Sequence, residues 1–144
     1  MARRYLQGKF TPANPHKYIG DYNNIVYRSS WERMVFDAVD KEPSVLKWCS
    51  EEVVVPYIGL DGREHRYFID MFIVTKTKKL LVEIKPHSQT KAPRNTKRKK
   101  ESTYVNEVVA YHTNQLKWEA ATKWADERGL EFVVWTEKEL GIKL

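Results

Sequence analysis

Three charged side chains interrupt an apolar stretch of the 144-residue chain, FIDMFIVTKTKKLLVEIKP, residues 68–86. They are Asp70, Glu83 and Lys85. Without them the stretch has the composition of a buried β-hairpin, with the polar run TKTKK as its turn. Charged groups are rarely buried unless they are paired or bind a metal. These three residues are therefore the first candidates for a functional site.

The register of this hairpin decides whether the three charges meet. A tight turn centred on Lys76 and Thr77 would place Asp70 directly opposite Glu83. Because side chains alternate along a strand, both carboxylates and Lys85 would then share one face. The other face would carry only apolar side chains: Ile69, Met71, Ile73, Leu80, Val82 and Ile84.

Two interpretations of this arrangement remain open. Facing carboxylates repel each other, and partial burial strengthens the repulsion. In the first interpretation, Asp70, Glu83 and Lys85 form an ion cluster that neutralises itself, an arrangement that adds little to stability. In the second, the carboxylates hold Mg²⁺, a hard cation that prefers oxygen ligands and leaves room for water and substrate. The spacing Asp-x₁₂-Glu-x-Lys is loose, but its position on two neighbouring apolar strands favours the metal.

Glu32 also has two possible roles. Ser29-Ser30-Trp31-Glu32 matches a capping box, in which the glutamate reaches back to a backbone N–H at the start of a helix. A helix lying against the sheet could instead direct Glu32 at the same cation. The local sequence favours the cap.

The elements that position these residues follow from periodicity and turn residues. We expect a helix over residues 31–41, ended by Pro43. Its apolar positions at helical spacing are Trp31, Met34, Val35, Ala38 and Val39. Strands are expected at 52–58, about 65–74 and 80–85, joined by Asp61-Gly62 and by TKTKK. Two short connections in succession predict an antiparallel three-strand meander.

The rest of the chain predicts a helix, a strand and a short terminal element. A helix over about 103–128 would present Val105, Val108, Val109, His112, Leu116, Ala120 and Trp124, and would end before Gly129. A strand at 130–136 and a short helix or tail at 137–144 follow. A strand that returns through a helix should lie parallel to its neighbour. The chain should therefore form a mixed sheet with helices against both faces.

The composition is that of one globular domain, with 42% hydrophobic and 31% charged residues. Residues 1–24, rich in Pro, Gly, Asn and Lys, predict an N-terminal arm before a domain at 25–144. A single cysteine, Cys49, excludes an internal disulfide, and we expect it to be packed rather than reactive. No stretch reaches the length of a membrane span, so we expect a soluble, intracellular protein without a membrane partner.

The net charge of +6 is concentrated in one segment. Seven basic and no acidic residues lie between Lys85 and Lys100, so the rest of the chain is nearly neutral. The polar loop expected at 86–102 contains six of them: Lys91, Arg94, Lys97, Arg98, Lys99 and Lys100. Such a loop either binds a polyanion such as DNA or is a solvated loop that aids solubility.

Five segments in order resemble the TnsA-like endonucleases of the PD-(D/E)xK superfamily, a group that includes phage head-completion nucleases. They are YRSSWERMVF, WCSEEVVVPY, HRYFIDMFIV, LLVEIKPHSQ and NQLKWEAATKWADERGLEFVVWT, within roughly residues 18–140. The resemblance implies an α/β, restriction-endonuclease-like fold with an αβββαβ core and a mixed sheet flanked by helices.

The resemblance also implies roles for individual residues. The catalytic set would be Glu32, Asp70, Glu83, Lys85 and Gln89. The ligands of Mg²⁺, for which Mn²⁺ could substitute, would be Asp70, Glu83, the backbone carbonyl of Ile84, and Glu32. Asn114 and Lys117, in NQLKW, would contact DNA together with the basic loop, although an ordinary polar helix surface is an equal alternative. Ile69 stands where the superfamily name has proline.

The implied function is Mg²⁺-dependent DNA cleavage by a phage head-completion nuclease that acts on packaged DNA ends. Its expected partners are DNA and phage head or portal proteins, without a small-molecule substrate, in the host cytoplasm or the virion. The alternatives are a catalytically inactive DNA-binding or structural head protein, and a transposition or junction-resolving endonuclease.

Overall fold

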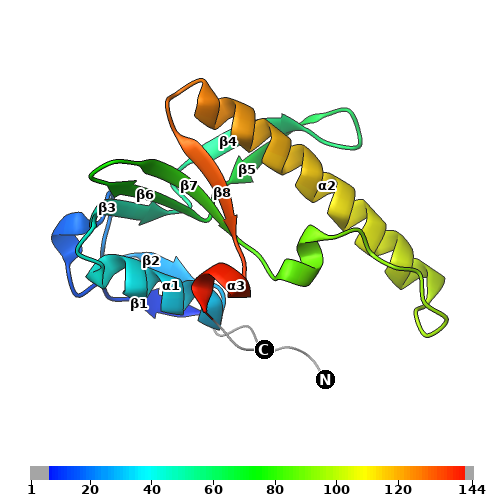
Figure 1. Cartoon of the computed structure of the whole chain (residues 1–144), viewed down its shortest axis with the longest axis horizontal. Helices are drawn as coiled ribbons and strands as arrows, with labels where there is room; N and C mark the ends of the chain where they lie inside the picture. Colours follow the sequence, from blue (N-terminus) through cyan, green and yellow to red (C-terminus); the bar gives the residue numbers. More distant parts are fainter. Residues whose placement is uncertain (1–6, 142–144) are drawn as a thin grey trace.

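The computed structural model describes residues 7–141 and places a four-stranded mixed sheet between two helices (Figure 1). The strands lie in the order β3 (Val45–Ser50), β6 (Met71–Thr75), β7 (Lys79–Ile84) and β8 (Glu131–Trp135). The first three are antiparallel, and β8 lies parallel to β7. Helix α1 (Ser30–Lys41) covers one face and α2 (Glu101–Asp126) the other. The mixed sheet with helices on both faces is as the sequence predicts.

The element order α1, β3, β6, β7, α2, β8 is an αβββαβ core, which confirms the expected restriction-endonuclease-like class. The predicted meander, however, is wrong. Strands β4 (Val54–Ile58) and β5 (Glu64–Phe68) form a separate two-stranded hairpin, inserted between β3 and β6. The first strand of the core sheet is β3, which the sequence analysis missed because its run VLKWCS lacks a clear alternation of polar and apolar residues.

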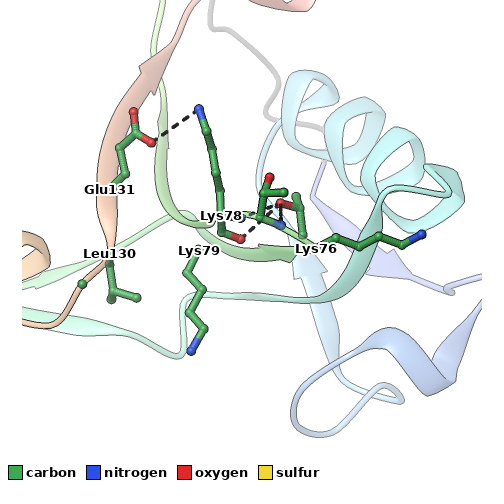
Figure 2. A pocket seen from close by; sticks show the side chains of 8 residues that line it. Lys76, Lys78, Lys79, Leu130 and Glu131 are labelled. Carbon is green, nitrogen blue, oxygen red and sulfur yellow. Dashed lines mark hydrogen bonds and ion pairs between the residues drawn. The ribbon is translucent and has the colours of Figure 1, made fainter.

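The predicted register of the β6–β7 hairpin is correct. Phe72 pairs with Leu81 and Val74 with Lys79. The tight turn is closed by the N–H of Thr75, which donates to the carbonyl of Lys78 at 2.8 Å. A cavity of about 410 Å³ lies beside this turn, where three lysine side chains diverge (Figure 2). It lies at the opposite end of β7 from Glu83, so it is remote from the acidic residues.

Each helix packs on its own apolar core. Helix α1 buries Val35, Phe36 and Val39 against Met71, Ile73 and Val82 of the sheet. Met34 and Ala38, which share the helical spacing of the apolar positions, are exposed. The buried stripe is rotated because α1 also buries Asp40, described below. On the other face, α2 buries Ala121 and Ala125.

The predicted placement of Ile69 on the same face as Met71 and Ile73 is wrong. Ile69 is buried on the α2 side, with Tyr67 and Leu81. The chain leaves β5 at Phe68 and enters β6 only at Met71, so the alternation of side chains does not continue from one strand into the next. This interruption places Asp70 between two strands that belong to different sheets.

The N-terminal half of α2 projects beyond the sheet (Figure 1). Val105 and Val109 are 50% and 48% exposed there, and His112 is also exposed. The helical spacing of these three residues predicts the helix correctly, but their side chains are not buried. Gly129 adopts φ 69°, and the N–H of Leu130 donates to the carbonyl of Ala125 at 2.9 Å, which ends the helix as expected.

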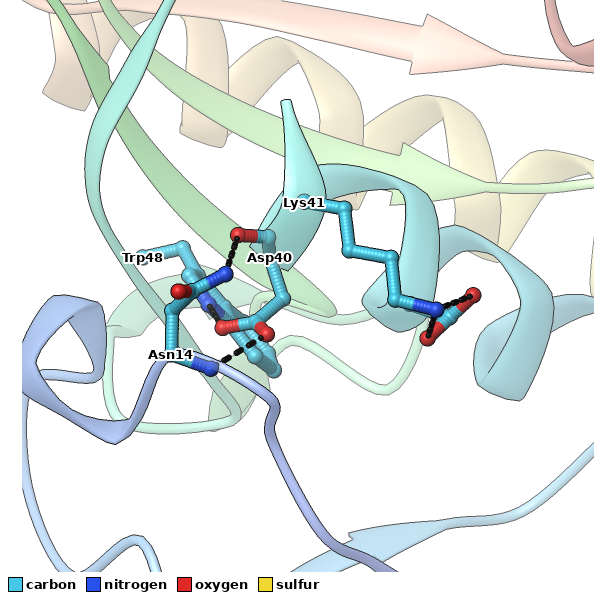
Figure 3. Close-up of polar contacts among 5 residues, drawn as sticks. Asn14, Asp40, Lys41 and Trp48 are labelled. Carbon is cyan, nitrogen blue, oxygen red and sulfur yellow. Dashed lines mark hydrogen bonds and ion pairs between the residues drawn. The ribbon is translucent and has the colours of Figure 1, made fainter. Parts of the chain in front are cut away.

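The N-terminal segment packs onto the domain from residue 7 onward, whereas residues 1–6 of the expected arm lie outside the described part. Strands β1 (Gly8–Phe10) and β2 (Ile25–Tyr27) pair with each other, and Phe10 lies in the α1 core. A short 3₁₀ helix, η1 (Pro15–Lys17), separates them. Figure 3 shows the anchor at Asp40, whose carboxylate accepts from the N–H of Asn14 at 2.9 Å and from Trp48 Nε1 at 3.1 Å.

The remaining elements also follow the predicted order. A 3₁₀ helix, η2 (His87–Thr90), begins the basic loop, and α2 begins at Glu101. The short helix α3 (Glu137–Leu140) follows β8, and residues 142–144 of the predicted tail lie outside the described part.

Cys49 is buried as expected, and burial raises its pKa to about 12. Among the described residues, no helix has the length and apolar character needed to span a membrane.

Candidate active site

Asp70 is the centre of the candidate site. Its Oδ2 atom accepts the N–H of Ile84 at 2.8 Å, which ties the carboxyl to the end of β7. Burial is the main cause that raises the pKa of Asp70 well above its ordinary value of 3.8, and the charge of Glu83 is the second. The two carboxyls are close enough to share a hydrogen bond when one is protonated. They therefore lie on the same side of the hairpin, as its register requires.

Glu83 lies on β7 and is 7% exposed. Its Oε2 atom accepts a short hydrogen bond from the Tyr67 hydroxyl, and its Oε1 atom lies 3.8 Å from Nζ of Lys85. Burial, followed by the charge of Glu83, raises the pKa of Tyr67 far above its ordinary value, so the phenol stays protonated and acts as the donor. Glu83 and Lys85, the pair of the E-x-K pattern, are therefore close in space, and Asp70 lies beside Glu83.

Glu32 makes the contacts of a helix cap and also faces two other carboxylates. Its N–H donates to Oγ of Ser29 at 3.1 Å, and its Oε2 atom accepts from the N–H of Arg28 at 2.6 Å. The residue therefore caps α1. Its carboxylate also lies within 4.8 Å of carboxylate oxygens of Asp70 and Glu51. Burial raises the pKa of Glu32, and the charge of Glu51 adds to the shift.

Glu51 is the site residue that the sequence analysis missed. It follows β3 directly and adopts φ 54°, a left-handed conformation that is uncommon outside glycine. Its N–H donates towards the carbonyls of Ile69 and Asp70, at 3.2 and 3.3 Å. Its Oε1 atom lies 2.8 Å from Nη1 of Arg28. The signal available in the sequence was the Glu-Glu pair between two apolar runs, in WCSEEVVV.

Three carboxylates therefore converge, with oxygens within 4.8 Å of one another, from α1, the end of β3 and the β5–β6 junction: Glu32, Glu51 and Asp70. Glu83, on β7, adjoins this acidic cluster through Asp70. Arg28 forms an ion pair with Glu51, and Lys85 forms an ion pair with Glu83. Convergent carboxylate oxygens are the donor set of a hard divalent cation such as Mg²⁺ or Mn²⁺. After burial, the negative charge of Glu83 is the largest cause of the raised pKa of Asp70, and a divalent cation would offset that charge. The residues present fit the expected metal.

Gln89 and Asn114 border a cavity of about 810 Å³ between η2, the basic loop and α2. Gln89 is exposed, and its N–H donates to the carbonyl of Pro86 at 2.9 Å. Lys91 and Arg94 line the same cavity. With Lys99, which also lines the cavity, the structure brings together three of the predicted DNA contacts on the loop and one on the helix, next to the predicted catalytic residue Gln89.

The predicted DNA contacts differ in their surroundings. Lys97, Arg98 and Lys100 are exposed. Lys99 is pinned to α2, because its Nζ atom lies 2.7 Å from both the carbonyl of Arg94 and a carboxylate oxygen of Glu107. Lys117 lies over the hairpin, with Nζ 5.4 Å from the ring centroid of Tyr67 and 5.9 Å from that of Tyr57.

Comparison with known proteins places this geometry in a family. The family model described as "TnsA-like endonuclease N terminal" matches residues 42–137. The "Head completion nuclease" of Enterobacteria phage T4 is 37% identical over 146 residues, which cover 94% of this chain and 96% of that protein. No solved structure matches. The matched range contains Asp70, Glu83 and Lys85, and the chain belongs to the TnsA-like endonuclease family.

Proposed function

We propose that this chain is a Mg²⁺-dependent endodeoxyribonuclease that acts on DNA ends during completion of a phage head. The observation that carries the proposal is the burial of Asp70 among other carboxylates, with Lys85 beside them. A chain that had kept the fold and lost the chemistry would have no reason to retain this repulsive arrangement.

The proposed roles follow from the contacts of each residue. Asp70, Glu83 and the backbone carbonyl of Ile84 would hold the ion, with Glu32 and Glu51 directly or through water. A bound Mg²⁺ would polarise the scissile phosphate and lower the pKa of a water molecule. Lys85, 3.8 Å from Glu83, would stabilise negative charge that develops on the phosphate and help to orient the attacking water. Gln89 would position the substrate at the edge of the site.

DNA would bind along the basic loop and the adjoining face of α2. Lys91, Arg94, Lys97, Arg98 and Lys100 are exposed and can contact backbone phosphates without reading the sequence. Lys99 would contribute mainly by holding the loop against α2 at Glu107. Asn114 would contact DNA at the cavity, whereas Lys117 would act partly through the rings on which it lies.

The biological role rests on the relative from phage T4, whose name describes head completion. Coverage of nearly the whole length of both proteins supports the same role for this chain. We therefore propose head or portal proteins as its partners, and the host cytoplasm or the virion as its location. Residues 1–24 would serve as an arm that packs over the nuclease domain at 25–144 and is anchored at Asp40.

Lys85→Ala tests the catalytic assignment, with Lys79→Ala as its matched control on the same strand. Lys79 is exposed at the turn end of β7, away from the acidic cluster. Lys85→Ala should abolish cleavage of plasmid DNA in Mg²⁺ and leave DNA affinity largely intact, whereas Lys79→Ala should cleave normally. Normal cleavage by Lys85→Ala would show that the site is wrongly assigned.

The substrate class can be tested by comparing plasmid, linear, branched and single-stranded DNA, with Mg²⁺ and with EDTA. A nuclease that acts on DNA ends should favour linear DNA, and cleavage should stop in EDTA. Preference for branched DNA would instead support a junction-resolving enzyme. Cleavage of all four substrates in EDTA would contradict the metal dependence.

The salt dependence of binding tests the basic loop. Replacing Lys97, Arg98 and Lys100 by glutamine should flatten the slope of log affinity against log salt by about 0.9 for each phosphate that is no longer neutralised. A variant with Lys76 and Lys78 replaced is the control, since these lysines lie at the remote β6–β7 turn. An unchanged slope for the loop variant would remove this segment from the interface.

A further inference from the structure

Tyr67 belongs to the inserted hairpin but makes a contact at the candidate site. It lies on β5, is 4% exposed, and packs in the core under α2 with Val55 and Ala121. Its hydroxyl nevertheless donates a short hydrogen bond to Oε2 of Glu83. The hairpin is not part of the four-stranded sheet, so this bond joins two separately paired pieces of the fold.

The neighbours of Tyr67 fix the direction of this hydrogen bond. The indole Nε1 of Trp118 is buried beside the phenol, close enough to affect its pKa but without a hydrogen-bond partner among residues 7–141. An indole N–H can only donate, and an ionised carboxylate can only accept. The phenolic hydrogen must therefore point at Glu83. Lys117 adds a positive charge 5.4 Å from the centroid of the same ring.

From these contacts we infer that Tyr67 is a positioning residue, which fixes the carboxylate of Glu83 so that one oxygen remains available to a divalent cation. With Oε2 bonded to Tyr67, Oε1 is the atom that faces Lys85, at 3.8 Å from its Nζ atom. Residues that hydrogen-bond to metal-binding carboxylates orient them, and their loss commonly weakens metal affinity by about 10–100-fold. This inference rests on the proposed metal-dependent nuclease.

Tyr67→Phe removes only the hydroxyl, and Tyr57→Phe is the matched control. Tyr57 lies on the neighbouring strand β4 and also carries Lys117 over its ring, but its hydroxyl makes no hydrogen bond in the described structure. Mn²⁺ binding, measured by electron paramagnetic resonance, should weaken by about tenfold in Tyr67→Phe. It should remain unchanged in Tyr57→Phe and weaken strongly in Glu83→Gln.

Cleavage kinetics separate positioning from a structural role. In Tyr67→Phe the half-saturating Mg²⁺ concentration should rise by a similar factor, while KM for DNA stays the same and kcat recovers at saturating Mg²⁺. Loosened packing alone would lower the melting temperature without moving the Mg²⁺ midpoint. An unchanged midpoint in a folded Tyr67→Phe variant would overturn the inference.

The unmodified chain supplies a second measurement if Tyr67→Phe does not fold. Mg²⁺ titration should shift the Cζ resonance of labelled Tyr67 with the midpoint found for metal binding, and an unshifted resonance would contradict the inference. The two hypotheses fail differently. If the wild-type chain binds neither ion, the proposed function fails. If it binds both and Tyr67→Phe binds equally well, only the role of Tyr67 fails.

Discussion

Asp40 is fully buried and Asp70 is half-buried, both near the end of a secondary-structure element, but their surroundings are opposite. Each carboxylate oxygen of Asp40 has an N–H donor, from Asn14 or Trp48. Asp70 has one N–H donor, from Ile84, and otherwise faces Glu83, Glu32 and Glu51. A buried carboxylate surrounded by donors stabilises the fold, whereas one surrounded by acceptors requires a cation. On this ground Asp40 stabilises the fold, and Asp70 is the candidate for a functional role.

The largest expected effect is on cleavage by Asp70→Asn. The amide is nearly isosteric but cannot supply the charge that holds a divalent cation, so cleavage should fall by roughly a hundredfold or more. Plasmid cleavage in Mg²⁺ measures this loss, and DNA affinity should be nearly unchanged. Stability in EDTA should not decrease, because the substitution removes repulsion. Wild-type cleavage by this variant would end the functional interpretation of Asp70.

Asp40→Asn should show the opposite pattern. The amide has only one oxygen, so its NH₂ group would face one of the two N–H donors and leave that donor without an acceptor. This should lower the free energy of unfolding by about 1–3 kcal/mol. Urea denaturation measures this cost. Cleavage per folded molecule should stay at the wild-type level. A loss of cleavage in fully folded Asp40→Asn would show that the two aspartates are not functionally distinct.

The third effect is a pH dependence of stability that comes from Asp70. Because its pKa is raised in the folded chain, proton uptake favours folding. This contribution is complete below the unfolded-state pKa of about 3.9 and is lost as pH rises through the folded-state pKa. In EDTA, the wild type should therefore lose stability relative to Asp70→Asn between about pH 4 and neutrality. Urea denaturation across this range tests it, and a constant difference would contradict the raised pKa.

The smallest effect is expected for Asp37→Asn, a control on the same helix as Asp40. Asp37 is exposed and pairs with Lys41 at 3.0 Å. Exposed pairs of this kind contribute about 0.3–0.5 kcal/mol. The variant should unfold almost like the wild type and cleave DNA normally. A cost as large as that of Asp40→Asn would mean that burial does not explain the difference between the two positions.

The sequence alone predicted the pairing of Asp70 with Glu83 because this part of the site is local. A two-residue turn fixes the register, and the register fixes which side chains meet. The cap at Ser29, which accepts from the N–H of Glu32, is equally local and is present, but the Glu32 carboxylate accepts from the N–H of Arg28 and not from that of Ser29, as a full capping box would require. The two long helices and the strands other than β3 in the core sheet followed from periodicity, which chain neighbours determine.

Glu51 and the inserted hairpin could not be predicted in the same way. Glu51 reaches the site because its backbone takes a left-handed conformation at the end of β3, and the residue type gives no indication of this. The change of sheet between Phe68 and Met71 depends on which strands pair at long range. The contact between Tyr67 and Glu83 depends on the same change. Sequence periodicity describes one strand at a time and contains no information about these pairings.

The length of α2 sets a distance scale for the whole molecule. Its 26 residues extend over about 39 Å at 1.5 Å per residue, close to the roughly 34 Å of one turn of B-form DNA. The N-terminal end of α2 lies clear of the sheet (Figure 1), so the two ends of this helix are separated by about the length of one turn of B-form DNA. Groups at those two ends would face the same side of a straight double helix.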